Sequence, residues 1–351
     1  MKEARFYERL PRGLVRCRLC PRQCRIRPGE TGWCKVRRND AGQLWLSSYG
    51  RVAAEGMDPV EKKPLYHFYP GSWIYSLSAR GCNLRCRWCQ NWRLSQEDGP
   101  SVAVPPATPV ELVARSRRRG APCVGLAFTY SEPLVWYEYV YDAARLARER
   151  GYASVLVTNG YVQEEPLRDL LPYVNAMNVD VKSWREASYR RWCGGQLAPV
   201  LRTVEIAAEA GCHIELTYLM IPDLNDSAGE VDDMVKWVAG LDRGIPLHLT
   251  RYFPAHKLDT PPTPISTLRR AAEQARGRLD YVYLGNTWEE GSDTLCPQCG
   301  TPVILREGHH VTGCRLRGHQ CATCDREIRL VGQVLAGEGA GMRREGLDEQ
   351  A

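Results

Sequence analysis

Three cysteines in the run Gly-Cys-Asn-Leu-Arg-Cys-Arg-Trp-Cys-Gln-Asn have the spacing of a metal-cluster loop. They are Cys82, Cys86 and Cys89, spaced C-x3-C-x2-C, and no fourth cysteine follows closely. A [4Fe–4S] cluster normally takes one thiolate on each of its four irons. A loop with three thiolates therefore leaves one iron open to a ligand that is not protein. Zinc is the alternative metal, but structural zinc sites favour two CxxC pairs, so the spacing predicts an iron–sulfur cluster.

This loop resembles that of the radical S-adenosylmethionine (SAM) enzymes. The resemblance implies that the amino and carboxylate groups of SAM bind the open iron. One electron from the cluster then splits the sulfonium group and releases a 5′-deoxyadenosyl radical that abstracts hydrogen. It also implies that Cys82, Cys86 and Cys89 are the catalytic ligands and that Trp88 lies beside the adenine.

The segment between about residues 74 and 285 alternates apolar strands with helices. We expect strands at 74–79, 124–130, 155–157, 177–181, 213–221, 247–252 and 281–284, and helices at 110–119, 133–150, 167–173, 200–210, 227–241 and 266–275. Such alternation predicts an α/β fold, with a parallel sheet covered by helices. Six or seven units make a partial (β/α)6-type barrel, with the cysteine loop at the C-terminal end of its first strand.

Polar residues stand where the predicted strands end, and these segments resemble those of the pyruvate formate-lyase activating enzymes. Tyr-Ser-Glu-Pro replaces the Gly-Gly-Glu-Pro of that family, and Val157 replaces an Asp, which removes a carboxylate from its monovalent cation site. The resemblance implies SAM-binding roles for Ser131, Glu132, Thr158, Asn159, Asp180, Lys182 and His256. The structural alternatives are a helix N-terminal charge for Glu132, an ion pair between Asp180 and Lys182, and simple exposure of His256.

Two further cysteine groups flank the predicted barrel. Cys296, Cys299, Cys321 and Cys324 form two CxxC pairs, which predict a zinc ribbon closed to substrate. Cys17, Cys20, Cys24 and Cys34 are spaced C-x2-C-x3-C-x9-C and suit either Zn²⁺ or an auxiliary [4Fe–4S] cluster. The Cys20-Pro21 pair resembles a structural zinc knuckle and favours zinc. The nearby arginines are Arg16, Arg18, Arg22, Arg25 and Arg27, and they suit thiolate charge, an acidic electron donor or nucleic acid.

These features divide the chain into four predicted parts. Residues 1–72 are a four-cysteine metal-binding segment and linker, 73–290 the partial barrel, 291–330 the zinc ribbon and 331–351 a disordered tail. The chain has 351 residues and a formal net charge of +6, and it shows no apolar run long enough to span a bilayer. Its first residues lack the apolar core of a signal peptide, so we expect a cytoplasmic protein.

The stretch 58–71 has two interpretations. Its prolines, Pro59, Pro64 and Pro70, exclude a long helix. It is either a stiff linker whose aromatic rings cover the base of the barrel, or a substrate lip. In a lip, the rings would enclose the radical and Lys62, Lys63 or His67 would orient a polar group.

The whole chain resembles the radical SAM component of the so-called AmmeMemoRadiSam system, a relative of the pyruvate formate-lyase activating enzymes. The segments in which this resemblance is found are residues 17–21, 49–52, 58–71, 81–92, 158–160 and 296–299. The resemblance implies a radical SAM oxidoreductase that activates or modifies a protein, with AMMECR-domain and Memo-domain proteins as partners. A flavodoxin or ferredoxin-like protein would supply the electron. RNA modification and a non-catalytic zinc-stabilised scaffold are the alternatives, although no aromatic ladder accompanies the arginines to stack bases.

Overall fold

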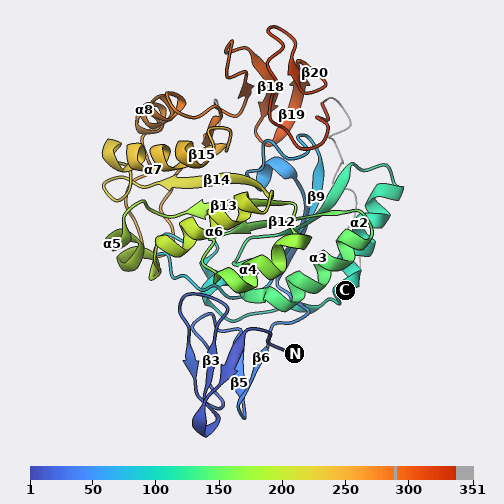
Figure 1. Cartoon of the computed structure of the whole chain (residues 1–351), viewed down its shortest axis with the longest axis vertical. Coiled ribbons are helices and arrows are strands. Elements are labelled where there is room, and N and C mark those ends of the chain that lie inside the picture. The colour runs from blue at the N-terminus through green and yellow to red at the C-terminus, as the bar shows by residue number, and fades with distance from the viewer. Residues whose placement is uncertain (288–290, 337–351) are drawn as a thin grey trace.

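Figure 1 shows the computed structural model, which places the barrel between two smaller units at opposite ends of the long axis of the molecule. The structure describes residues 1–287 and 291–336. Residues 288–290, and residues 337–351 of the predicted tail, lie outside the described residues. No helix in the described part is long and apolar enough to cross a membrane.

The central sheet has eight strands in the order β16-β15-β14-β13-β12-β11-β9-β8. All neighbours are parallel except β8, which pairs antiparallel with β9. The strands are β8 (Ala54–Pro59), β9 (Trp73–Ser78), β11 (Cys123–Phe128), β12 (Ala153–Thr158), β13 (Ala176–Val181), β14 (His213–Met220), β15 (Leu247–Arg251) and β16 (Val282–Gly285). Seven of the eight confirm the predicted strands, because their apolar residues are buried on both faces, as a helix-covered parallel sheet requires. β8 was missed, since its sequence Ala-Glu-Gly-Met-Asp-Pro has no strand pattern, and the sheet therefore begins before residue 73.

Helices connect the parallel strands and cover the sheet (Figure 1). They are α2 (Ala107–Arg118), α3 (Tyr137–Glu149), α4 (Glu164–Leu170), α6 (Ala198–Glu209), α7 (Ala228–Leu241) and α8 (Ile265–Arg276), with the shorter α1 (Trp92–Gln96) and α5 (Glu186–Ser188) near the predicted site. Local sequence sets their ends. Pro133 opens the 3-10 turn before α3, and the Ser227 side chain accepts a hydrogen bond from the Glu230 backbone at the start of α7.

The N-terminal unit consists of short antiparallel strands. β1 (Lys2–Glu3), β5 (Arg37–Asp40) and β6 (Gln43–Leu46) form one sheet; β2 (Tyr7–Arg9), β3 (Val15–Cys17) and β4 (Arg25–Ile26) form another; β7 (Arg51–Val52) pairs with β10 (Val102–Ala103). The unit packs on α3 and on the 3-10 turn before it. The indole of Trp136, in that turn, donates to the Ser48 carbonyl at 2.8 Å, and the Arg5 backbone donates to Glu138 of α3 at 3.0 Å. The four-cysteine segment is thus fixed against the barrel.

The C-terminal unit is a small β module. It contains β17 (Thr294–Leu295), β18 (Pro302–Glu307), β19 (His310–Cys314), β20 (Leu316–Arg317) and β21 (Gln320–Cys321). A buried ion pair joins it to the barrel, with Arg306 Nε 3.5 Å from Glu61 Oε1. The fold is therefore the predicted α/β type, a mostly parallel sheet covered by helices, with a C-terminal cysteine module.

The stretch 58–71 closes the base of the barrel. The His67 ring is fully buried between the Arg329 carbonyl and the Tyr283 hydroxyl, at 2.6 Å from each. Its backbone donates to Glu215, near the start of β14, at 2.7 Å. Parallel strands share one direction, so this end lies opposite the cysteine loop. The cover interpretation is confirmed for His67, and the lip is wrong for that residue. Lys63 is buried against Asp58, whose carboxylate also accepts a hydrogen bond from Tyr130, just after β11, so for Lys62 and Lys63 the lip stays a prediction.

Candidate functional site

The cysteine loop follows β9 at the C-terminal edge of the sheet, as predicted. The Cys82 sulfur accepts hydrogen bonds from the Leu84 backbone at 3.3 Å and from the Asn159 amide at 3.6 Å. The Cys89 sulfur lies 3.4 Å from the Ser95 hydroxyl. Cys86 is buried, and Cys82 and Cys89 are half-buried.

The spacing of these sulfurs suits a cluster better than a single ion. Zinc–sulfur bonds of about 2.3 Å place tetrahedral thiolates roughly 3.8 Å apart. Among the described residues, the loop cysteines do not form a group whose sulfurs all lie within 4.8 Å of one another. In a cubane each thiolate binds a different iron, so the sulfurs stand farther apart than around one ion. Cys82, Cys86 and Cys89 are therefore not gathered as a single tetrahedral ion requires, and three thiolates are the set that a [4Fe–4S] cluster with one open iron takes.

Glu132 organises the ends of two adjacent strands. Its carboxylate accepts hydrogen bonds from the Leu134 backbone at 3.0 Å, the Thr158 hydroxyl at 2.6 Å and the Asn159 backbone at 2.8 Å. Burial raises the pKa of Glu132, and these hydrogen bonds oppose the shift. Asn159, held in this way, reaches Cys82 with its side-chain amide. Glu132 thus positions Asn159 beside the cluster loop.

Asp180 and Lys182 leave β13 as an ion pair beside Cys86. Burial alone would lower the pKa of Lys182, but the Asp180 carboxylate and then the Cys86 thiol outweigh burial and raise it. The second carboxylate oxygen of Asp180 is buried and has no hydrogen-bond partner. Such an atom is costly unless a ligand satisfies it. The ammonium or hydroxyl groups of SAM are donors of the required kind, so these residues fit that cofactor.

The remaining predicted residues border the loop. Ser131 donates to the Ala79 carbonyl at 2.6 Å, which ties the end of β11 to the loop. The ring of His256 stacks on Trp92 with centroids 5.0 Å apart, just after the loop. Trp88 is 3% exposed and belongs to the core, so its place beside the adenine stays a prediction.

Two residues near the loop were missed. Asn83 accepts from the Asn159 amide at 2.9 Å and donates to the Tyr161 carbonyl at 2.6 Å. Cys193 was interpreted only as a core cysteine; it is buried, and its thiol lies against Cys86, whose pKa it raises together with burial. The position of Asn83 inside the loop was the available signal, whereas nothing in the sequence placed Cys193 there.

The cysteine pairs of the C-terminal module meet at one point. The Cys296 and Cys324 sulfurs are 3.5 Å apart, and those of Cys299 and Cys321 are 3.7 Å apart. All four lie within 4.8 Å of one another, as one tetrahedral ion requires. The group fits a structural metal ion, as expected of a ribbon.

The four N-terminal cysteines also converge, but differently. They line one cavity together with Arg37 of the same unit and Asn83 of the cluster loop. They do not form a group of sulfurs within 4.8 Å in the described structure. The cavity therefore joins a predicted metal site to the loop.

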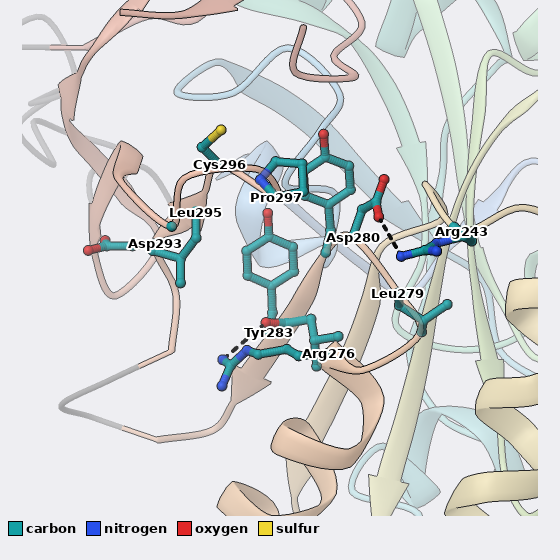
Figure 2. A pocket seen from close by; sticks show the side chains of 12 residues that line it. Arg243, Arg276, Leu279, Asp280, Tyr283, Asp293, Leu295, Cys296 and Pro297 are labelled. Carbon is teal, nitrogen blue, oxygen red and sulfur yellow. Dashed lines mark hydrogen bonds and ion pairs between the residues drawn. The ribbon is translucent and has the colours of Figure 1, made fainter. Parts of the chain in front are cut away.

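A separate pocket of about 230 Å³ lies where the ribbon meets the barrel. Figure 2 shows Cys296 and Pro297 on its ribbon side and Arg243, paired with Asp280, on its barrel side. It borders the start of β16, at the end of the sheet opposite the cysteine loop. It is thus distinct from the predicted SAM site.

The comparisons with known proteins agree with this site. A model of the Radical SAM superfamily matches residues 76–238, which include the cysteine loop. This part of the chain is therefore a radical SAM domain, and enzymes of that superfamily use SAM and a [4Fe–4S] cluster. More narrowly, the chain shares a family with an uncharacterized protein of Methanocaldococcus jannaschii, to which it is 42% identical over 337 residues, covering 94% of this chain and 100% of that protein.

More distant relatives match about half to two thirds of the chain. Pyruvate formate-lyase 1-activating enzyme of Escherichia coli K12 is 22% identical over 169 residues, covering 47% of this chain and 69% of the enzyme. GTP 3′,8-cyclase of Rhizobium meliloti is 28% identical over 170 residues, covering 45% and 47%. The structure of Streptococcus suis SuiB bound to S-adenosylmethionine shares the fold at a TM-score of 0.50 and 13% identity, covering 65% of this chain and 54% of that one.

Proposed function

We propose that this protein reductively cleaves SAM at a [4Fe–4S] cluster held by Cys82, Cys86 and Cys89. The 5′-deoxyadenosyl radical so formed abstracts hydrogen from the substrate. The observation that carries the proposal is the unpartnered, buried Asp180 oxygen beside the three-cysteine loop. Asp180 and Lys182 hold the polar end of SAM, and Glu132 keeps Asn159 in place.

Cleavage of SAM by the anaerobically reconstituted and reduced protein tests this proposal. The expected products are 5′-deoxyadenosine and methionine, and Cys86→Ala should abolish them because the cluster loses a ligand. Cys193→Ala is the matched control, since that thiol lies against Cys86 outside the motif. It should keep the cluster. Loss of the cluster in Cys193→Ala would make Cys193 a fourth ligand and contradict the open iron.

We further propose that the substrate is a protein, as for an activating enzyme. The barrel is similar to pyruvate formate-lyase 1-activating enzyme, which is named for the activation of another protein. The AMMECR-domain and Memo-domain proteins are the proposed partners. Anaerobic co-purification with both, followed by mass spectrometry of the bound protein and RNA, tests this. A SAM-dependent modification found only on RNA would favour the alternative substrate class.

A further inference from the structure

Two tryptophans lie next to the cluster loop, and each is in contact with two arginines. Trp33 belongs to the N-terminal unit, and Trp192 belongs to the π-helical turn Tyr189–Cys193 that follows α5. We propose that an acidic one-electron carrier protein docks on the surface formed by these side chains. This Trp/Arg surface consists of Trp33, Trp192, Arg22, Arg85, Arg87 and Arg191. The inference rests on the proposed function, because cleavage of SAM requires one electron at the loop cluster.

The Trp33 half of the surface is fastened to the loop by two arginines. The guanidinium carbons of Arg22 and Arg85 lie 4.2 and 5.3 Å from the centre of the Trp33 ring. Arg22 donates hydrogen bonds to the Asn83 and Gly194 carbonyls, and Arg85 donates to the Trp33 carbonyl. Trp33 is still 46% exposed. A fixed and exposed tryptophan beside arginines suits an interface anchor, since Trp and Arg are enriched among the residues that dominate binding energy.

The Trp192 half meets the same loop. The guanidinium carbons of Arg87 and Arg191 lie 5.2 and 4.9 Å from the centre of the Trp192 ring. The Arg87 backbone donates to the Trp192 carbonyl at 3.1 Å. Arg85 and Arg87 are the sequence neighbours of Cys86, so the two halves of the surface meet at a predicted cluster ligand. A protein bound here would contact the loop that holds the cluster.

The charge of the surface is available to a partner. Within the described part of the chain, no carboxylate forms an ion pair with Arg22, Arg85, Arg87 or Arg191. Arg22 and Arg85 donate to backbone carbonyls, while Arg87 and Arg191 are exposed beside their tryptophan. Unpaired surface charge of one sign attracts a partner of the opposite sign and speeds its association. The surface therefore favours an acidic carrier.

The arginines that stand beside the N-terminal cysteines in sequence are less available. Arg16 pairs with Glu8 at 2.7 Å, and Arg18 lies 3.7 Å from Glu165. Arg22 differs from both, because it reaches the loop and donates to its backbone. The docking site is thus centred on the loop and does not follow the arginine-rich segment.

A carrier protein fits this surface better than RNA does. Single-stranded nucleic acid stacks its bases on a series of free aromatic faces. Here guanidinium groups already lie over both tryptophan rings. The carrier loses one electron and the loop cluster gains it, so the transfer needs no other reactant. The surface gives the N-terminal unit a role in this step, since Trp33 and Arg22 both belong to that unit.

SAM cleavage driven by different reductants tests the docking site. Dithionite is a small reductant that needs no docking surface, whereas reduced flavodoxin and reduced [4Fe–4S] ferredoxin are acidic proteins. At limiting carrier, Arg87→Glu/Arg191→Glu should slow carrier-driven cleavage about tenfold or more and leave dithionite-driven cleavage unchanged. The effect should shrink at high salt, because salt screens exposed charges.

Arg117→Glu/Arg148→Glu is the matched control. These arginines also lie over aromatic rings, those of Tyr152 and Tyr173, but in the last turns of α2 and α3, at the end of the sheet opposite the loop. The control changes the net charge by the same amount and should leave carrier-driven cleavage unchanged. An equal loss in both variants, or no loss in either, would overturn the proposal. So would a wild-type protein that dithionite reduces and neither carrier does.

Binding of oxidised flavodoxin separates this inference from the proposed function, because it requires no turnover. Surface plasmon resonance should show affinity about tenfold or more weaker in Arg87→Glu/Arg191→Glu and in Trp33→Ala, with the control variant unchanged. Absence of SAM cleavage with dithionite would refute the proposed function and leave this binding result to be judged by itself. Equal flavodoxin affinity in all four proteins would overturn the docking site, and so would tighter binding of transfer RNA that the same variants lose.

Discussion

The Cys34 carbonyl oxygen lies against the α-carbon of Gly81, the residue before the first loop cysteine. A β-carbon on Gly81 would come within 2.7 Å of that oxygen and 2.8 Å of a Val36 methyl group. Gly81 also has a φ of +103°, which side chains other than hydrogen rarely allow. Glycine is thus required twice, for the turn into the loop and for the approach of the N-terminal unit.

Gly81→Ala should separate the N-terminal unit from the loop. Gly120→Ala is the matched control, because Gly120 has a φ of +84° with open space around its α-carbon. Both variants lose about 1–2 kcal/mol from the backbone strain, and Gly81→Ala should lose about 1–3 kcal/mol more from overpacking. Urea unfolding measures the difference, and iron content should fall only in Gly81→Ala. Equal losses of unfolding free energy in the two variants would show that the close contact of Gly81 with Cys34 and Val36 does not contribute to stability.

Glu132→Gln tests whether the carboxylate positions Asn159. An amide cannot accept from all three donors that Glu132 binds, so at least one buried N–H or O–H is left unpaired. We expect a loss of about 1–3 kcal/mol in unfolding free energy and SAM affinity about tenfold weaker, or about 1.4 kcal/mol. Unchanged affinity in Glu132→Gln would remove the positioning role.

The barrel could be predicted because a short stretch of sequence is enough to identify each of its strands. Runs such as Cys123–Phe128 are apolar on both faces, and parallel topology then brings the strand ends together. That topology placed Glu132, Asn159 and Asp180 near the cysteines before any contact was known. The contacts of Glu132 were not predictable, since a sequence does not tell whether a carboxylate faces a ligand or two backbone amides.

The N-terminal unit was not predictable for a physical reason. Its strands have two to four residues, and β5 alternates buried Arg37 and Asn39 with exposed Arg38 and Asp40. A polar run of this kind does not reveal which face is buried. The partner of Arg37, Glu138, is 101 residues away. The arginines noted from the sequence for their positive charge lie between positions 16 and 27, beside the cysteines. Arg37, the arginine that is buried in the cavity wall, lies outside that segment.

Arg306→Met should destabilise the junction between ribbon and barrel. Its partner Glu61 has no exposed side-chain surface, so the variant leaves a buried charge uncompensated, at a cost of about 3–5 kcal/mol. Glu61→Met/Arg306→Met should recover part of that loss, and the double-mutant cycle measures the coupling. Arg317→Met is the control, since its pair with Asp325 is exposed. A double variant less stable than Arg306→Met would contradict this account.

Cys299→Ser tests the metal at the ribbon. Four thiolates hold the proposed ion, and a small β module depends on it for folding. We expect the loss of about one zinc per chain and faster proteolysis within 291–330, with iron unchanged. Cys314→Ser, in the same module, should retain the zinc. Release of iron in place of zinc would show that the ribbon metal is misassigned.

The buried ring of His67 should make stability depend on pH. The Arg329 carbonyl can only accept, so His67 Nδ1 carries the proton and Nε2 accepts from the Tyr283 hydroxyl. Burial lowers the pKa of His67 to about 3, and the nearby Glu215 carboxylate only partly opposes it. An unfolded histidine titrates near its ordinary pKa of about 6.5. Between these values the unfolded chain binds the extra proton, so stability falls as the pH falls.

His67→Gln should remove this dependence. Glutamine still offers one donor and one acceptor, but it does not titrate. Urea unfolding between pH 4 and 6 should give a slope that is smaller than that of the wild type by up to about 1.4 kcal/mol per pH unit, the value for one proton. At pH 8, where His67 is neutral in both states, the two proteins should differ only by a constant loss of packing. Parallel stability curves from pH 4 to 8 would show that His67 does not contribute to acid sensitivity.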